Sequence, residues 1–351
     1  MTVSVGINGY GTIGKRIADA VDAQPDMTLV GVAKTRPDFA ASMATDRGRS
    51  LYVAGEHRER FVEERVPFEG DVADLVAESD VVVDATPGGV GAENRPLYVR
   101  NDTPAIFQGG ETADVADVSF NARANFEEAA GGEYVRVVSC NTTGLSRLIA
   151  PLEENYGIEK VRATLIRRGG DPGQPSRGPI DDILPNVTVP SHHGHDVQTV
   201  FPSVAVDTTA VTVPATHMHV HSVNVTLDRS PTPGAVRSLL EGESRIVMVE
   251  EEMGLVGCGA LQELAKDAGR PRGDLPENVV WRESVTVRDR DLYLLQAIHQ
   301  ESNVVPENVD AIRAVAGVAS ASRSVRTTDR TLDIGSVWDR NGRTVVESAT
   351  D

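Results

Sequence analysis

The stretch VSVGINGYGTIG, residues 3–14, decides the fold of the first half of this chain. An apolar run typical of a buried strand leads into the pattern GxGxxG, and apolar residues then recur at helical spacing from Ile17. This strand, turn and helix context is the one that the dinucleotide-binding fingerprint requires. Gly9 permits a tight turn, Gly11 lets a pyrophosphate approach the backbone, and Gly14 lets the helix pack on the strand. The sequence therefore predicts a nucleotide site at the N-terminus of this helix.

Apolar strands that end in turns recur along the first 139 residues. The segments 80–89 (DVVVDATPGG) and 105–111 (AIFQGGE) both end in glycine turns, the first containing Thr86 and the second Gly109. Strands that alternate with helices predict an α/β, doubly wound parallel sheet of the Rossmann type, and cofactors bind beyond the carboxyl ends of such strands. Both turns should therefore face the cofactor crevice, as should Cys140, which follows a strand at 134–139.

A basic segment follows the second strand of this domain. A protein that selects NAD carries an acidic residue about 20 residues beyond the glycines, where it binds the ribose 2′-hydroxyl. Here the strand at 28–33 ends in Lys34-Thr35-Arg36. Lys34, with Thr35 or Arg36, could neutralise a 2′-phosphate, so we expect NADP to be accepted and preferred over NAD. The alternative is that these are solvated charges of a loop.

Cys140 stands where a strand pattern stops and a helical one begins. The helix is indicated by an apolar face at positions 145, 148, 149 and 152, with polar Asn141, Thr142 and Thr143 in the capping region. The free N–H groups and the positive dipole end of a helix stabilise thiolate over thiol. Together with a histidine they could lower the cysteine pKa to below about 7, which would make Cys140 a nucleophile. The alternative is a small buried cysteine without a chemical role.

The second half of the chain has strands joined by long polar connections, which predicts an α+β domain with a mostly antiparallel sheet. One expected strand, 217–225, places His217, His219 and His221 on one face. Each of the three could act as a general base. Because no carboxylate or cysteine ligand pattern lies nearby, no metal site is expected.

A polar loop, PSHHGHD at 190–196, is rich in hydrogen-bond donors. Arg167, Arg168 and Arg177 precede it closely enough to help bind an anion. A phosphate-bearing ligand would suit this loop, and the alternative is a solvated histidine loop.

Length and charge restrict the class of protein. The chain has 351 residues, which suits two domains, and a formal net charge of -18, which would repel nucleic acid. Lysine occurs only at positions 15, 34, 160 and 266, and this acidic, lysine-poor composition is typical of proteins adapted to high salt, although an ordinary acidic enzyme is the alternative.

Targeting signals and disulfide patterns are not evident. No apolar stretch of about 18 residues is present, and the chain begins with a strand pattern, so we expect neither a membrane span nor export. The two cysteines, Cys140 and Cys258, predict no disulfide framework and fit a reducing cytoplasm.

Six blocks occur together and in order, at residues 9–16, 84–88, 107–111, 139–144, 190–194 and 300–313. They resemble the archaeal (type II) glyceraldehyde-3-phosphate dehydrogenases, here of a halophile, and the blocks SCNTT and QESNVVPEN are the specific ones. The resemblance implies phosphorylating, reversible oxidation of D-glyceraldehyde 3-phosphate to 1,3-bisphosphoglycerate with NAD or NADP, in glycolysis or gluconeogenesis. It also implies a homotetramer in which a Rossmann domain, 1–139, is completed by 301–351, and a catalytic and oligomerisation domain spans 140–300.

The resemblance also implies residue roles. Cys140 would be the nucleophile that forms a thioester, and His219 its general base. The nucleotide would be lined by Thr12, Ile13, Gly109, Arg168 and Gln300, and the substrate contacts would be Ser139, Asn141, His193 and Gly194. One departure is Gly169-Gly170, where the family usually has alanines. The alternatives are a dehydrogenase of the aspartate-semialdehyde type and a non-catalytic regulator that senses NADP.

Overall fold

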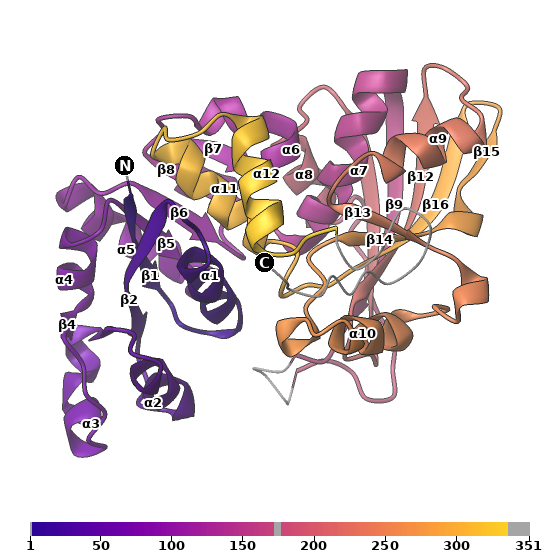
Figure 1. Ribbon diagram of the computed structural model, residues 1–351. Helices are drawn as coiled ribbons and strands as arrows, with labels where there is room; N and C mark the ends of the chain where they lie inside the picture. Colours follow the sequence, from indigo (N-terminus) through magenta and orange to yellow (C-terminus); the bar gives the residue numbers. More distant parts are fainter. Residues whose placement is uncertain (1, 172–176, 336–351) are drawn as a thin grey trace, which may run out of the picture. The chain divides into compact units, whose positions relative to one another are not determined.

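The computed structural model describes residues 2–171 and 177–335 (Figure 1). The chain divides into two compact units. Among the described residues, the first unit comprises 2–139 and Val305–Leu332, and the second comprises 140–171, 177–304 and 333–335. The C-terminal return to the first unit thus begins at Val305, within the expected segment 301–351, of which residues 336–351 lie outside the described residues.

The first unit contains an eight-stranded sheet in the order β4-β3-β2-β1-β5-β6-β8-β7, in which every pair of neighbours is parallel. The strands are β1 (Val3–Asn8), β2 (Met27–Lys34), β3 (Leu51–Val53), β4 (Gly70–Asp71), β5 (Val81–Asp84), β6 (Ala105–Gln108), β7 (Val118–Phe120) and β8 (Tyr134–Val137). The helices are α1 (Thr12–Asp22), α2 (Phe39–Asp46), α3 (Arg58–Glu63), α4 (Val72–Ala77), α5 (Val90–Arg100), α6 (Ala122–Asn125), α11 (Val305–Val315) and α12 (Ala321–Thr331). The strand order reverses between β1 and β5, so the predicted doubly wound sheet is confirmed.

The C-terminal helix α11 is part of the core of the first unit. Arg313 is fully buried and its guanidinium bonds both carboxylate oxygens of Asp26, at 2.7 and 2.9 Å. Asn308 lies inside this helix and donates from Nδ2 to Oε1 of Gln108 at 2.5 Å. These buried polar contacts join α11 to the start of β2 and the end of β6, which lie far away in the sequence. They therefore help to fix where α11 packs in the first unit.

The second unit contains a mixed sheet in the order β10-β11-β9-β12-β16-β14-β13, with β15 paired to β16. The pairs β9–β11 and β13–β14 are parallel and the other pairs are antiparallel. The strands are β9 (Ile158–Arg168), β10 (Leu184–Asn186), β11 (Ala205–Val213), β12 (His219–Leu227), β13 (Ile246–Val249), β14 (Asn278–Trp281), β15 (Thr286–Arg288) and β16 (Asp291–Ile298). The helices are α7 (Cys140–Tyr156), α8 (His192–Gln198), α9 (Pro233–Glu241) and α10 (Cys258–Asp267). Within residues 2–171 and 177–335, no helix is long and apolar enough to cross a membrane.

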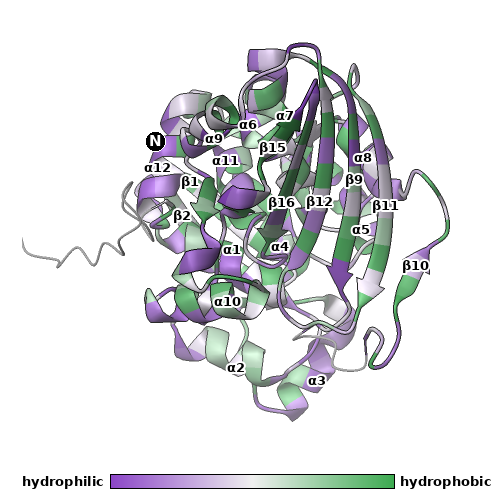
Figure 2. Ribbon diagram, turned by 90° about the vertical axis from the view of Figure 1, so that its right-hand side faces the viewer, coloured by the Kyte–Doolittle hydropathy of each residue, from purple (hydrophilic) through white to green (hydrophobic). Residues whose placement is uncertain are grey.

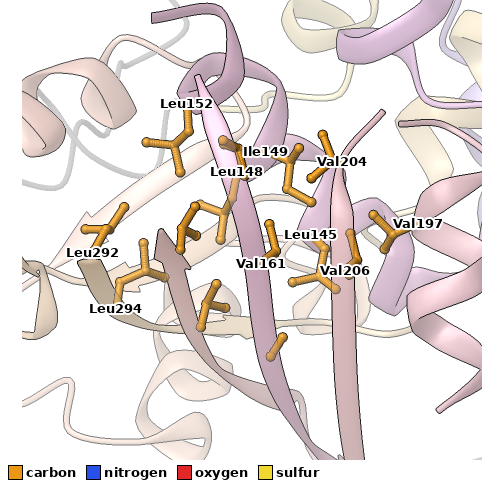
Figure 3. Close-up of a cluster of buried hydrophobic side chains, with 14 of the residues drawn as sticks. Leu145, Leu148, Ile149, Leu152, Val161, Val197, Val204, Val206, Leu292 and Leu294 are labelled. Atoms are coloured by element: carbon orange, nitrogen blue, oxygen red, sulfur yellow. The ribbon is translucent and has the colours of Figure 1, made fainter. Parts of the chain in front are cut away.

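Helix α7 packs on one face of this sheet and so fixes the position of its first residue, Cys140. Figure 3 shows the side chains of α7 that meet strand residues in the core, namely Leu145, Leu148, Ile149 and Leu152 with Val161, Val206, Leu292 and Leu294. In Figure 2, β11, β9, β12 and β16 lie side by side with hydrophobic and hydrophilic residues alternating along them. This alternation matches a sheet with only one face buried against α7.

Candidate active site

The glycine turn after β1 has the geometry that a nucleotide site needs. Gly9 has φ +102°, and a Cβ at this position would lie 2.6 Å from the carbonyl carbon of Ala85, so the turns after β1 and β5 are in direct contact. A Cβ at Gly14 would lie 1.9 Å from the main-chain oxygen of Gly9. A Cβ at Gly11, in contrast, would meet no atom within 4 Å. Gly9 and Gly14 are therefore required by packing, whereas Gly11 leaves open space in front of α1.

The N-termini of α1 and α5 differ in whether an acidic side chain accepts hydrogen bonds from their main-chain N–H groups. At α5, the carboxylate of Glu111 accepts from the main-chain N–H groups of Gly89 and Gly91 at 2.8 and 3.0 Å. At α1, the capping residue offers no side chain, and the first turn, which begins with Thr12 and Ile13, contains no acidic residue. Only α1 of these two helices has N–H groups available for an external anion such as a pyrophosphate.

Thr86 and Gly109 lie at the carboxyl ends of β5 and β6, as expected. Asp84 accepts from the main-chain N–H of Thr86 at 3.0 Å and also from its hydroxyl. The other oxygen of Asp84 accepts from the hydroxyl of Tyr98 at 2.6 Å and from Asn94 at 2.9 Å. The turn that contains Thr86 is therefore held by a buried carboxylate, a role for Asp84 that the sequence analysis missed. Gly109 has φ +116° and open space around it.

The ammonium group of Lys34 already has an anionic partner within the first unit. Its Nζ lies 2.9 Å from Asp38, whose carboxylate also accepts from the N–H groups of Ala40 and Ala41 at the start of α2. Burial disfavours ionisation of Asp38, but its bond to Lys34 and the lysine charge outweigh this and lower its pKa. That Lys34 neutralises a 2′-phosphate therefore stays a prediction, in which the ammonium group would share itself between the phosphate and Asp38. Arg36 is exposed and has no ion-pair partner among the described residues.

Cys140 is the first residue of α7 and is partly exposed. Burial raises the pKa of its thiol to about 11, against the opposing charge of Arg167 and the N–H of Asn141. The expected thiolate with a pKa below about 7 is therefore not what this structure contains. The reason is one of magnitude, since a helix terminus contributes about 1 kcal/mol, or less than one pKa unit, whereas desolvation shifts a pKa by up to about 3–5 units.

The carbonyl end of Cys140 is held by the block QESN. Nδ2 of Asn303 donates to the main-chain oxygen of Cys140 at 2.8 Å, and the buried guanidinium of Arg147 donates to the main-chain oxygen of Asn303 at 2.8 Å. The block QESN thus positions the candidate nucleophile through the side chain of Asn303, a role that the sequence analysis missed.

The three histidines of the expected strand have different environments. Strand β12 begins at His219, so His217 lies outside it and is exposed, and the prediction that all three share one face is wrong for His217. Both ring nitrogens of His221 are engaged, Nε2 with Oδ1 of Asn141 at 3.0 Å and Nδ1 with Nε2 of Gln296 at 3.1 Å. These contacts leave His219 as the buried histidine of the three with an available ring nitrogen.

His219 is held by one hydrogen bond. Its Nδ1 accepts from the main-chain N–H of Arg168 at 3.0 Å, and no described residue bonds its Nε2. Burial lowers the pKa of His219 well below the usual value, with the charges of neighbouring arginines acting in the same direction. The imidazole is therefore neutral, with its proton on Nε2.

Buried polar groups without hydrogen-bond partners lie near Cys140 and His219. Both ring nitrogens of His193 and Nε of Arg167 are buried without a hydrogen-bond partner among the described residues. Burial, aided by the neighbouring His192 and Arg167, lowers the pKa of His193 to about 2. The charge of Arg167 also acts on Cys140 and His219, so it lies within electrostatic range of both. Because leaving a buried polar group unpaired costs about 1–3 kcal/mol, such a group of donors indicates a ligand with acceptor oxygens.

The remaining substrate candidates lie beside this group. Gly194 follows His193 in α8, where a Cβ would lie 3.0 Å from the main-chain oxygen of Val206. Ser139 directly precedes α7 and ends the first unit. Among the described residues, no three His, Cys, Asp or Glu side chains are arranged to hold a metal ion.

Arg168 and Gln300 are brought together in the second unit. Nε of Arg168 donates to Oε1 of Gln300 at 3.1 Å, and its NH2 group pairs with the carboxylate of Glu301. Burial opposes ionisation of Glu301, but bonding to His299 and the charge of Arg168 lower its pKa to about 2. Glu301 was missed in the sequence analysis, although it lies within a block that was recognised as specific.

Steric contacts explain why glycine occupies the two positions after Arg168. A Cβ at Gly169 would lie 2.6 Å from Cδ of Pro179, and one at Gly170 would lie 2.9 Å from a side-chain carbon of Thr216. The backbone at Gly178, with φ +88°, lies against Gly169. Alanines at 169 and 170 would therefore require this loop to move away from Arg168.

Comparisons with known proteins agree with this arrangement. Residues 139–263 match the family described as glyceraldehyde 3-phosphate dehydrogenase, C-terminal domain, and residues 3–113 match dihydrodipicolinate reductase, N-terminus. A glyceraldehyde-3-phosphate dehydrogenase of Halobacterium salinarum is 64% identical over 95% of this chain and 100% of its own length. Those of Haloarcula marismortui and Thermococcus kodakarensis are 61% and 51% identical, over 94% and 95% of this chain and 94% and 99% of their own lengths. This chain belongs to the glyceraldehyde-3-phosphate dehydrogenase family.

Proposed function

We propose that this protein catalyses the phosphorylating, reversible oxidation of D-glyceraldehyde 3-phosphate to 1,3-bisphosphoglycerate with NAD or NADP. The observation that carries the proposal is the cysteine at the start of α7 beside donors that lack partners, Arg167 and His193. These donors suit the oxygens of a phosphorylated aldehyde and of inorganic phosphate. Relatives with this printed name that match over nearly the whole chain support the same reaction.

The chemistry begins at the thiol of Cys140. Its sulfur bonds to the aldehyde carbon as the C=O π bond breaks, and the proton that leaves the sulfur is balanced by one taken up by the carbonyl oxygen, which becomes the hydroxyl of a hemithioacetal. A bound nicotinamide would supply the hydride acceptor for oxidation of that carbon, and the hydroxyl proton would pass to a base. We assign this proton to His219, whose neutral ring can accept it once the ring changes tautomer or Nδ1 releases the main-chain N–H of Arg168. Inorganic phosphate then attacks the thioester carbon, and the carbon–sulfur bond breaks to release 1,3-bisphosphoglycerate.

The first unit supplies residues suited to a dinucleotide. The open N–H groups of α1 beside Gly11, at Thr12 and Ile13, would bind the pyrophosphate. Thr86 and Gly109 lie at the ends of neighbouring parallel strands and would contact the nucleotide. The nucleotide roles of Arg168 and Gln300, which hydrogen-bond each other, rest on the family resemblance. The residues at these positions fit a dinucleotide.

Preference for NADP over NAD is the finer part of this proposal. Arg36 is the exposed cation beyond β2, and the ammonium of Lys34 could turn toward a 2′-phosphate only by sharing itself with Asp38. Arg36 therefore supports use of NADP, while Asp38 limits the preference.

We also propose a homotetramer that works in the cytoplasm. Apolar side chains of the segment 178–190 are strongly exposed in the single chain, with Ile180 at 93% and Val187 at 88%. A second copy of the chain would cover them. A reducing compartment would keep the nucleophilic thiol of Cys140 free. Light scattering in concentrated salt should give four times the chain mass of 37.5 kDa.

The function is tested by following nicotinamide reduction at high salt with glyceraldehyde 3-phosphate, phosphate and either cofactor. Turnover that depends on phosphate, with no turnover of aspartate semialdehyde, is the expected result. Cys140→Ser should bind cofactor but lose turnover, whereas Cys258→Ser, at the other cysteine, should keep it. Activity retained by Cys140→Ser would refute the thioester route, and a preference for aspartate semialdehyde would refute the substrate.

A further inference from the structure

A chain of buried hydrogen bonds runs through the second unit to Asn141, the residue after the nucleophile. Nδ2 of Asn278 donates to the main-chain oxygen of Gly144 at 2.7 Å and to Oε1 of Gln296 at 2.8 Å. Nε2 of Gln296 donates to the same oxygen of Gly144 at 3.1 Å and to Nδ1 of His221 at 3.1 Å. Nε2 of His221 then contacts Oδ1 of Asn141 at 3.0 Å.

The direction of every bond in this chain is determined by one atom. The main-chain oxygen of Gly144 can only accept, so the atoms of Asn278 and Gln296 that contact it must be amide nitrogens. A flipped Gln296 would place its oxygen against that carbonyl oxygen and its nitrogen against the nitrogen of Asn278. On the far side, Arg147 can only donate, and it contacts Oδ1 of Asn278 at 3.5 Å, which agrees with the same orientation.

The fixed amide of Gln296 determines the tautomer of His221. An N–H group of Gln296 points at Nδ1 of His221, so Nδ1 must carry a lone pair. The neutral ring then has its proton on Nε2, which donates to Oδ1 of Asn141. His221 is completely buried, so water does not offer its ring another partner.

The tautomer in turn orients Asn141. With Oδ1 bonded to His221, the Nδ2 group of Asn141 is turned away from the network and has no partner among the described residues. Asn141 as a residue is 2% exposed, and its Nδ2 is available to bind an acceptor of a ligand. A flipped amide would instead present its oxygen at the position of Nδ2, where it would repel the oxygens of a substrate.

We infer that His221 and Gln296 are positioning residues, which hold the amide of Asn141, already expected to contact the substrate, with its Nδ2 free to donate to a substrate oxygen. The inference rests on the proposed function for the identity of the substrate. It does not depend on that function for the orientation of the amide.

The first test removes the donor without changing its shape. Asn141→Asp keeps the bond from His221 but presents an oxygen in place of Nδ2, and we expect kcat/KM to fall by about 10²–10³-fold, as for loss of a donor to a reacting oxygen. Asn224→Asp is the matched control, because Asn224 lies on the same strand as His221 and bonds Arg162 and Leu292 on that strand's neighbours. Equal activity of the two variants would overturn the donor role.

The second test separates positioning from space filling. His221→Gln places an amide that can donate near the position of Nε2, whereas His221→Met fills a similar volume without a donor. We expect His221→Met to lose about 10–100-fold in kcat/KM and His221→Gln to retain most of it. A purely structural role predicts equal loss in both, and urea unfolding of each variant shows whether the fold is intact.

The third test does not use activity. In protein labelled with ¹⁵N at histidine, the shifts of His221 at neutral pH should show a proton on Nε2 and a lone pair on Nδ1. A proton on Nδ1, or an imidazolium, would overturn the inference even if the enzyme turns over glyceraldehyde 3-phosphate. If the expected tautomer is found but this aldehyde is not turned over, the proposed substrate fails and the amide orientation stands.

Discussion

The main-chain N–H of Arg168 donates a 3.0 Å hydrogen bond to Nδ1 of His219, which places the proton of the neutral imidazole on Nε2. In this state His219 is a donor, and it can accept a proton only after the ring changes tautomer or releases Arg168. Its proposed role as a base thus includes a step that the resting structure opposes.

His219→Gln tests this role, because glutamine keeps an N–H donor near the position of Nε2 but cannot accept a proton. If His219 removes the hydroxyl proton during oxidation, kcat should fall by about 10²–10⁴-fold. Hydride transfer should then limit turnover, which a primary deuterium isotope effect with substrate labelled at the aldehyde carbon measures. A kcat within about tenfold of the unaltered enzyme would mean that the imidazole is needed only as a donor.

The state of the Cys140 thiol gives a second prediction. Its pKa of about 11 leaves roughly one thiol in a thousand ionised at pH 8, so alkylation by iodoacetamide without nucleotide should be slow and should rise with pH. Arg167→Gln should slow it further, because the charge of Arg167 favours the thiolate. The positively charged nicotinamide of NADP should speed it. Arg162→Gln, on the exposed face of the same strand, is the control; a rate already constant with pH at pH 7 contradicts the prediction.

Local rules account for the parts of the fold and site that the sequence predicted. The requirement at Gly9 and Gly14 comes from contacts within one turn of chain, so the spacing alone locates the nucleotide turn. The parallel and mixed sheets follow from strand patterns that are likewise local. Cys140 could be placed at the start of a helix because the apolar face of that helix begins a few residues after Cys140.

Other properties of the site depend on partners far away in the sequence. His221 could not be distinguished from His219 as a candidate base until Gln296 and Asn141 were seen to engage both its nitrogens. The high pKa of Cys140 comes from burial, which no neighbouring residue in the sequence reports. The pairing of Lys34 with Asp38 is close in sequence, and the spacing i,i+4 was a signal that could have indicated it.

The fingerprint glycines provide a matched pair of variants for the third prediction. Gly11→Ala adds a methyl group to open space, so the free energy of unfolding should change by no more than about 0.5 kcal/mol. That methyl group would occupy the space needed for pyrophosphate, and NADP affinity should fall at least about tenfold, or 1.4 kcal/mol. Gly14→Ala places Cβ 1.9 Å from the oxygen of Gly9 and should unfold at clearly lower urea concentration. Unchanged NADP binding by a folded Gly11→Ala variant, measured by fluorescence titration, would contradict this placement of the cofactor.

Asp38→Asn should shift cofactor preference toward NADP. Asparagine still caps α2, so the helix should be retained, but the charge that neutralises Lys34 is removed. We expect the ratio of kcat/KM for NADP to that for NAD to rise about threefold to tenfold, equivalent to about 0.7–1.4 kcal/mol. Asp71→Asn, at the capping residue of α4, makes the same change at another cap and is the control. If both variants leave the ratio unchanged, Lys34 does not contact the 2′-phosphate.

Two buried histidines should make the stability of the protein sensitive to mild acid. The pKa values of His193 and His221 are lowered by burial to about 2 and about 3, whereas the unfolded chain has about 6.5. Between about pH 6.5 and pH 3 the unfolded state therefore binds protons that the folded state does not, so stability decreases as pH falls. Each histidine should contribute up to about 1.4 kcal/mol per pH unit. The measurement is urea unfolding at constant high salt from pH 7 to pH 4.5, with His193→Asn and His221→Asn each expected to reduce the slope. His195→Asn, at an exposed position of α8, is the control variant. If all three variants show the same change of unfolding free energy with pH, the rings of His193 and His221 do not account for the sensitivity to acid.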